Sequence, residues 1–140
     1  MVLAGEEKGT ASMAIPPSVP LVEKRQGRLH VHKPVAVRLQ PVRFGDRVVF
    51  IDRNQNEAGY VCLTLLSDYE ELYIDYFEVK KPFRGRGYGR KMYEWIETYA
   101  RRRGMKRIIL TPFNSSTSFW ARMGFRLILR QRYDMVKTLK

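Results

Sequence analysis

The sequence predicts a single α/β domain in which helices pack on a mixed, mostly antiparallel sheet with a central parallel strand pair. Three observations lead to this fold class. Residues 72–104 read as a strand, a glycine-rich turn and a long helix in direct succession. Strand-like runs rich in Val, Ile, Tyr and Phe come before this unit, and a second strand and helix follow it. A length of 140 residues fits one hydrophobic core.

The central unit has the clearest pattern. Its strand, residues 72–79, is rich in the aromatic and β-branched residues that suit a pleated backbone. Its helix carries large apolar side chains at spacings of 4, 3 and 4 residues, at Tyr88, Met92, Trp95 and Tyr99. This spacing places the four side chains on one helical face, so we predict a helix with that face packed on the sheet.

Further elements are predicted on both sides of the central unit. Before it we expect an edge strand within residues 28–39 and a hairpin of strands 47–51 and 58–66. After it we expect a strand at 107–110, a helix ending at Met123, and strands at 125–129 and 133–139. Residues 1–27 contain three Gly and three Pro and show no apolar period. We therefore predict a flexible N-terminal arm, 1–27, followed by one domain, 28–140.

Composition excludes several classes of protein. No apolar run is long enough to span a membrane, and the N-terminus lacks a secretory signal pattern, so we expect a cytoplasmic protein without a membrane partner. The single cysteine, Cys62, excludes an internal disulfide. The two histidines, His30 and His32, have no third ligand near them in sequence, so we predict no metal site.

Charge is distributed unevenly along the chain. The formal net charge is +12 at pH 7, which predicts a polyanionic partner such as nucleic acid or a phosphorylated cofactor. Residues 80–107 contain 11 Lys and Arg against two Glu, whereas residues 68–78 contain five acids and no base. A site for two substrates, one phosphorylated and one cationic, would need both signs. The alternative is that these acids only balance the basic helix on the surface.

The glycine-rich turn reads Arg84-Gly85-Arg86-Gly87-Tyr88-Gly89. Glycines let backbone N–H groups converge on an oxygen-rich ligand, and the start of the following helix adds unpaired donors and a partial positive charge. The two arginines carry forked donors that suit phosphate. The turn therefore predicts an anion site, and the alternative is a tight turn with a solvated basic rim.

Two motifs give the chain a resemblance to the GNAT superfamily of N-acetyltransferases. Residues 84–89 match the family signature (Arg or Gln)-x-x-Gly-x-(Gly or Ala), and Val79 stands five residues before it, where the family commonly has valine. Residues 119–125 match a second hallmark, an aromatic pair followed by Gly-Phe at the end of a helix. The resemblance covers roughly residues 58–139.

The resemblance implies acetyl-CoA as cofactor. Its pyrophosphate would lie on the backbone amides of residues 84–89, and its pantetheine arm would pair with the backbone near Val79, between two parallel strands that diverge. Asn114 would approach the same arm. The cofactor-binding residues that follow are Phe77, Val79, Arg84, Gly85, Arg86, Gly87, Tyr88, Gly89 and Asn114.

Acetyl transfer to an amine needs a group that accepts the ammonium proton and an acid that protonates the leaving thiolate. Asp75 and Glu78 are the carboxylates nearest to the expected thioester, and Asp75 is the preferred base. They are an odd number apart, so we expect them on opposite faces unless a bulge intervenes. Tyr133 is the candidate acid. Tyr73 and Trp120 stand where relatives commonly carry a catalytic glutamate and tyrosine.

The resulting hypothesis is an N-acetyltransferase that moves an acetyl group from acetyl-CoA to a primary amine of a cationic substrate. The acceptor would be a protein lysine, a protein N-terminus or a small amine. The alternative is a basic nucleic-acid-binding module on a GNAT fold with weak or lost catalysis. A homodimer formed through the C-terminal strands is a third hypothesis, because the usual N-terminal helices of the family are not evident.

Overall fold

The computed structural model describes residues 2–5, 38–113, 116–128 and 134–140. Within these residues eight strands form one sheet: β1 (Val2–Gly5), β2 (Gln40–Phe44), β3 (Arg47–Ile51), β4 (Glu57–Leu66), β5 (Glu71–Val79), β6 (Arg107–Leu110), β7 (Arg126–Leu127) and β8 (Met135–Thr138). The helices are α1 (Tyr88–Arg102) and α2 (Thr117–Arg122), with two short 3-10 turns, η1 (Ser67–Tyr69) and η2 (Lys81–Phe83).

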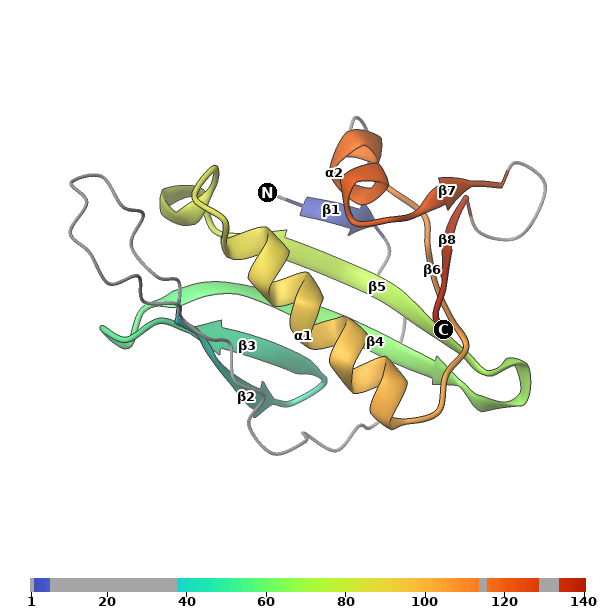
Figure 1. The fold of residues 1–140 in the computed structure, drawn as a ribbon. Coiled ribbons are helices and arrows are strands. Elements are labelled where there is room, and N and C mark those ends of the chain that lie inside the picture. The colour runs from blue at the N-terminus through green and yellow to red at the C-terminus, as the bar shows by residue number, and fades with distance from the viewer. Residues whose placement is uncertain (1, 6–37, 114–115, 129–133) are drawn as a thin grey trace, which may run out of the picture.

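The sheet confirms the predicted mixed topology. Its strands run in the order β2-β3-β4-β5-β6-β8-β7, and β1 joins as a second partner of β5. The pair β5–β6 is parallel, and all other neighbours are antiparallel. A parallel pair needs a crossover connection, and α1 provides it between β5 and β6 (Figure 1).

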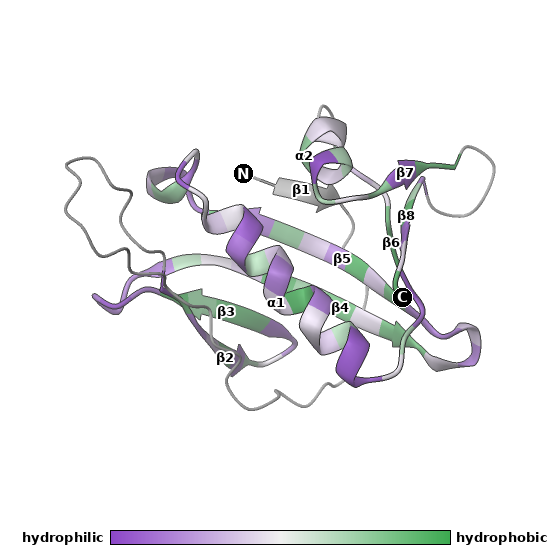
Figure 2. Ribbon diagram, viewed as in Figure 1, coloured by the Kyte–Doolittle hydropathy of each residue, from purple (hydrophilic) through white to green (hydrophobic). Residues whose placement is uncertain are grey.

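Helix α1 lies across one face of the sheet, as its apolar spacing predicts (Figure 1). Its buried side chains are Met92, Tyr93, Trp95, Ile96, Tyr99 and Ala100. Figure 2 shows hydrophobic residues along the strands that α1 crosses and hydrophilic residues on the outward side of the helix. Helix α2 extends the same core, since the Trp120 ring lies 5.1 Å from the Phe77 ring, centroid to centroid. Side chains from β5, α1 and α2 therefore pack in one core, which holds these three elements together.

A second, smaller apolar cluster lies apart from the main core. Ile109 and Val136 are its buried members, and Leu66 and Tyr73 pack against them. Leu66 alternates along β4 with Leu63 and Leu65, which belong to the main core. Side chains of a strand alternate between the two faces, so this cluster lies on the face opposite α1. This second face is where the candidate site residues of β5 lie.

Two strands depart from the sequence-based prediction. The predicted edge strand 28–39 lies outside the described residues except for Arg38 and Leu39, which are not in a strand, and the edge strand of the structure is β2. Gly45, with φ of +67°, makes the tight turn from β2 into β3. Strand β1 was also not predicted. Both strands depend on pairing with a neighbour rather than on a strong local pattern.

No described helix combines the length and apolar character that crossing a membrane requires. Among the described residues, no three His, Cys, Asp or Glu side chains come together in a way that could hold a metal ion.

Candidate functional site

The glycine-rich turn connects β5 to α1 through η2. Gly85 and Gly87 both take left-handed backbone conformations, with φ of +71° and +89°. Helix α1 then begins at Tyr88 with no side-chain cap and no acidic residue in its first turn. Fifteen residues of aligned peptide dipoles therefore end in an uncapped, positively polarised N-terminus.

The backbone donors of this turn point to an anion site. The Arg84 N–H donates to the Lys81 carbonyl at 3.2 Å, and the next paired donor is the Lys91 N–H, which bonds the Gly87 carbonyl at 3.2 Å. In the described part of the chain, the six N–H groups from Gly85 to Arg90 have no acceptor. Helix N-terminal donors without intrahelical partners are what phosphate oxygens bind.

The arginine side chains of the turn each donate a hydrogen bond to a nearby backbone carbonyl. Arg84 Nε donates to the Val79 carbonyl at 3.0 Å, and Arg86 donates through one guanidinium nitrogen to the Pro82 carbonyl at 2.9 Å. These bonds hold the turn against the end of β5. The turn therefore presents backbone N–H groups with two guanidinium charges beside them, and phosphate binding by these groups stays a prediction.

Gly89, the last glycine of the signature, serves packing. A Cβ atom at this position would lie 3.2 Å from Phe119 Cε1 and 3.5 Å from Val79 Cγ2. The absence of a side chain lets α1, α2 and β5 approach one another. Of the other predicted cofactor residues, Phe77 and Val79 have buried core side chains, so only their backbone lies at the strand edge. Tyr88 packs on Phe83 beside the turn, with ring centroids 5.0 Å apart.

Strand β5 changes partner part-way along one edge. Strand β6 pairs with β5 from Glu71 to Ile74, and β1 pairs with it from Tyr76 to Glu78. Opposite this change, the register of β4 shifts between Cys62 and Leu63, which leaves one extra residue, Asp75, in β5. The strand therefore carries a β-bulge at Asp75.

The bulge places both candidate carboxylates on the second face. Asp75 is fully buried, and Thr64 Oγ1 donates to its Oδ2 at 2.5 Å. Thr64 and Tyr60 are four residues apart and share one face of β4, and Tyr60 pairs with Glu78 beyond the bulge. Residues paired across two strands share a face, so the interpretation that a bulge could unite Asp75 and Glu78 holds for this strand.

Two further acids of the run pair with basic residues near the start of β6. Lys106 Nζ lies 3.8 Å from Glu70 Oε1, and Arg107 Nε lies 3.0 Å from Glu71 Oε2. These two pairs join the start of β5 to the start of β6, whereas Asp75 and Glu78 lie farther along β5. Four of the five acids therefore divide between a structural pair, Glu70 and Glu71, and a pair at the candidate site, Asp75 and Glu78.

Two tyrosines beside Glu78 were missed by the sequence analysis. The Tyr60 and Tyr76 rings stack with centroids 5.3 Å apart, and the Arg47 guanidinium lies 3.9 Å from the Tyr60 ring centroid. Burial raises the pKa of Tyr60, and its hydrogen bond with Tyr76 adds to the shift. Tyr60 therefore stays protonated at neutral pH. In the sequence, the only indication that Tyr60 and Tyr76 share this face is that each stands between apolar core residues on its own strand.

Four other residues complete the comparison with the sequence. Tyr133 and Asn114 lie outside the described residues. Trp120, which replaces a common catalytic tyrosine, is fully buried among aromatic rings of the core. Tyr73, at the position of a common glutamate, packs in the second apolar cluster.

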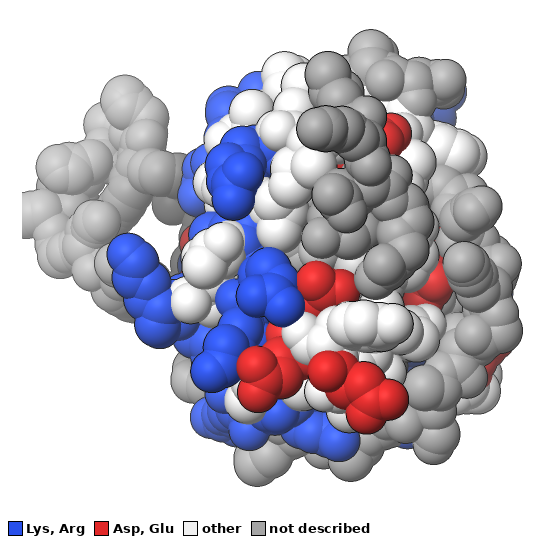
Figure 3. All heavy atoms as spheres, turned by 90° about the vertical axis from the view of Figure 1, so that its right-hand side faces the viewer, with Lys and Arg blue, Asp and Glu red and all other residues white. Residues whose placement is uncertain are grey.

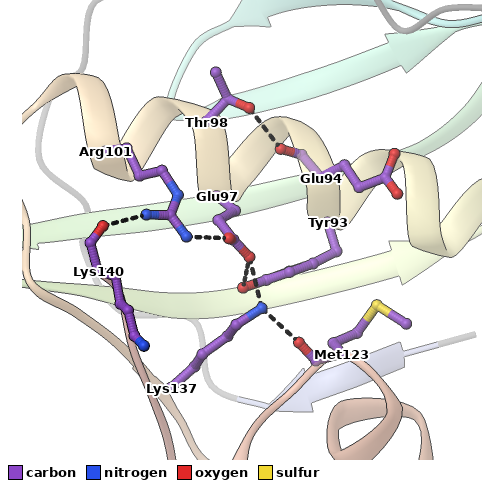
Figure 4. A network of polar contacts seen from close by, with 8 residues as sticks. All are labelled: Tyr93, Glu94, Glu97, Thr98, Arg101, Met123, Lys137 and Lys140. Atoms are coloured by element: carbon purple, nitrogen blue, oxygen red, sulfur yellow. Dashed lines mark hydrogen bonds and ion pairs between the residues drawn. The ribbon is translucent and has the colours of Figure 1, made fainter.

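A polar network centred on Glu97 connects α1 with β8 and the end of α2 (Figure 4). Glu97 Oε1 accepts from Lys137 Nζ at 2.7 Å and from the Tyr93 hydroxyl at 2.8 Å, while its Oε2 accepts from Arg101 at 2.6 Å. Lys137 also donates to the Met123 carbonyl at 2.7 Å. A cavity of about 330 Å³ lies among these side chains. Because each charged group of the network is hydrogen-bonded within it, we assign it to joining α1, α2 and β8.

Burial would raise the pKa of Glu97, but its hydrogen bonds from Lys137, Arg101 and Tyr93 outweigh burial and lower it. The pKa of Tyr93 is raised by burial and by the neighbouring Glu97 carboxylate. Glu97 is therefore ionised and Tyr93 protonated at neutral pH, so the Tyr93 hydroxyl can donate its 2.8 Å hydrogen bond to the Glu97 carboxylate.

Comparison with known proteins adds independent findings. The profile of the Acetyltransferase (GNAT) family matches residues 22–125. The chain is 36% identical over 71 residues to mouse N-alpha-acetyltransferase 80, which is 50% of this chain and 22% of that protein. The chain thus spans about a fifth of the length of this curated relative.

Solved structures share the fold. An acetyltransferase of the GNAT family from Staphylococcus aureus Mu50 superposes with a TM-score of 0.60 and 22% identity, covering 67% of each chain. N-acetylglutamate synthase from Neisseria gonorrhoeae, complexed with coenzyme A and N-acetyl-glutamate, gives a TM-score of 0.56 and 18% identity. That match covers 68% of this chain and 26% of the synthase chain.

Proposed function

The chain belongs to the acetyltransferase (GNAT) family, and from this premise we propose that it acetylates a primary amine of a cationic substrate. Enzymes of this family take the acetyl group from acetyl-CoA. The observation that supports this function most strongly is the run of six unpaired N–H groups from Gly85 to Arg90 at the start of α1. Such a run fits the pyrophosphate of CoA.

The edge of β5 next to this turn would hold the rest of the donor. Its pantetheine arm carries amide groups, which can pair with a strand edge as a peptide does. The edge nearest the turn is the part of β5 between Tyr76 and Val79, beyond the point where β6 stops pairing. The bound donor would supply the activated acetyl group, and the protein would supply its position.

The acceptor amine would approach from the second face of the sheet. Glu78 and Asp75 give this face negative charge beside Tyr60 and Tyr76. An ammonium group would be attracted there and must lose its proton before it reacts. We assign the proton-accepting role to Glu78, because its side chain is partly exposed whereas Asp75 is fully buried and bonded to Thr64.

The relative named N-alpha-acetyltransferase favours a polypeptide α-amine among the three acceptor classes. The test is release of free CoA thiol from acetyl-CoA with three acceptors. They are a lysine-free peptide with a free N-terminus, an N-terminally blocked peptide with one lysine, and spermidine. We expect the first to react fastest. Transfer only to the blocked peptide would assign lysine as the acceptor, and transfer only to spermidine would assign a small amine. Transfer to none of the three would refute the proposal.

The proton-accepting role has its own test. The Glu78→Gln variant should lower kcat by about 10²- to 10⁴-fold, the usual contribution of a general base. Its affinity for CoA should stay the same. Glu57→Gln is the matched control, since Glu57 lies on β4 and only forms a 3.6 Å surface pair with Lys80. Equal kcat values for the two variants would exclude Glu78 as the base.

The nucleic-acid alternative is less well supported by the charge distribution. Five of the 11 basic residues in 80–107 face a carboxylate within 4 Å: Lys80, Lys91, Arg101, Lys106 and Arg107. Figure 3 shows basic and acidic atoms side by side on the face to the right in Figure 1. A duplex-binding surface would carry a larger area of one sign.

A further inference from the structure

The edge of β5 from Tyr76 to Glu78 is already used by a segment from the start of the chain. Val2 pairs with Glu78, Ala4 with Phe77 and Gly5 with Tyr76, all in antiparallel register. Strand β1 therefore takes the place beside β5 that β6 leaves when its pairing ends at Ile74 (Figure 1). Strands β1 and β6, which are distant in sequence, thus pair with successive parts of the same edge of β5.

The contact made by β1 is short. It consists of three residue pairs and includes a register shift between Val2 and Ala4. In the described part of the chain, β5 is the only strand with which β1 pairs. A backbone hydrogen bond contributes about 0.5–1.5 kcal/mol net, so a ladder of this length can be displaced by a ligand that binds the same edge.

The position of β1 coincides with the place proposed for the pantetheine arm. Strand β5 continues from Glu78 through Val79 into η2, and the turn with the six unpaired N–H groups begins at Gly85. A ligand with its phosphates on this turn and an amide-bearing arm along β5 would meet β1 at the strand edge. Adjacent strands lie only about 4.8 Å apart, so the edge has room for one of the two.

We propose that residues Val2–Gly5 are an internal competitor of acetyl-CoA, bound to the edge of β5 at Tyr76–Glu78 in the free protein and displaced when the donor binds. This inference rests on the proposed function, because it takes the same strand edge as the donor site. It assigns the start of the chain a regulatory role: any partner or modification that removes β1 from the edge would increase the affinity for acetyl-CoA.

The first test weakens β1 within the full chain. Neighbouring residues of a strand point their N–H groups to opposite edges, so the double variant Leu3→Pro/Ala4→Pro removes a donor on whichever side faces β5. We expect calorimetry to show CoA bound about tenfold more tightly, since a backbone hydrogen bond worth up to about 1.5 kcal/mol no longer competes. Thermal unfolding of the variant checks that the domain itself is intact.

The second test locks β1 in place. Val2 and Glu78 are register partners, and directly paired residues of antiparallel strands have Cα atoms about 4.5–5.5 Å apart, within the range that a disulfide spans. The oxidised Val2→Cys/Glu78→Cys variant should bind CoA at least tenfold more weakly than the same variant after reduction. The native cysteine, Cys62, is buried and serves as the internal control for unwanted oxidation.

The outcomes separate the two proposals. Tighter binding by the proline variant, with weaker binding by the oxidised pair, supports competition. Equal affinities in all forms would overturn the competition and leave the donor site intact. If neither the unmodified chain nor any variant binds CoA at millimolar concentration, the proposed function falls, and the competition with it.

Discussion

Gly85 is the residue that most directly tests the anion site. Its φ is +71°, and a Cβ atom at this position would have no neighbour within 4 Å. The Gly85→Glu variant would therefore fit sterically but place a carboxylate beside the unpaired N–H groups of the turn. We predict that it weakens CoA binding by at least tenfold, measured by calorimetry, because like charges would meet at the pyrophosphate site.

Gly104→Glu is the matched control, since Gly104 has a φ of +78° and equally open surroundings at the far end of α1. Each variant should lose about 1–2 kcal/mol of unfolding free energy, because a residue with a Cβ is strained in a left-handed conformation. Equal CoA affinities for the two variants would remove the turn from the site.

Lys137 gives a prediction on pH dependence. The pKa of Glu97 lies below its ordinary value although burial alone would raise it, so the stability that this carboxylate contributes is present above the ordinary pKa and is lost as pH falls through the lowered one. The Lys137→Gln variant should lose about 1–2 kcal/mol at pH 7, where it leaves a largely buried carboxylate with only one of its two cations, Arg101. Denaturant unfolding at pH 7 and pH 3 should show this difference shrinking at low pH.

Lys91→Gln is the control for this pH effect. Lys91 forms a 3.5 Å pair with the more exposed Glu94, and surface pairs contribute about 0–1 kcal/mol. If both variants lose the same stability at pH 7, or if the Lys137 effect does not shrink as pH falls through the lowered pKa of Glu97, the ion pair is not its source.

At the scale of elements, Gly59 decides how closely β4, β5 and α1 can approach. A Cβ atom at this position would lie 2.9 Å from Met92 Sδ and closer still to the carbonyl oxygen of Glu78. We predict that Gly59→Ala lowers the unfolding free energy by about 2–3 kcal/mol in denaturant unfolding, because the backbone of β5 cannot move aside without disturbing the core.

Gly45→Ala is the comparison for Gly59, since Gly45 has open space and a left-handed φ of +67° in the turn between β2 and β3. Its cost should be about 1 kcal/mol, from backbone strain alone. A Gly59→Ala variant as stable as Gly45→Ala would mean that these strands and α1 are not held as closely as the structure indicates.

Elements differ in how well a pattern predicts them. Helix α1 was predictable because four large apolar side chains share one face and no competing strand pattern exists in that stretch. The bulge at Asp75 was not, because it depends on how β4 pairs with β5. Strand β1 was not either, since residues Val2–Gly5 acquire their strand conformation from an edge more than 70 residues away.

At the scale of the whole molecule, both ends of the described sheet carry exposed apolar side chains. Val42 and Phe44 on β2 are 42% and 66% exposed, and Leu127 on β7 is 51% exposed. Strand β7 has only two residues, which offers a short edge for the predicted homodimer through the C-terminal strands. That dimer stays a prediction.

The fold class, helix α1 and the glycine-rich turn could be predicted from the sequence, because each depends on residues that lie close together in the chain. Tertiary structure alone decided which groups meet across long distances. It set the bulge that unites Asp75 with Glu78, the stacking of Tyr60 on Tyr76, and the placement of β1 on the edge of β5. The physical reason is that strand register and edge pairing depend on the sheet as a whole, and a one-residue shift in register changes which face every later side chain occupies.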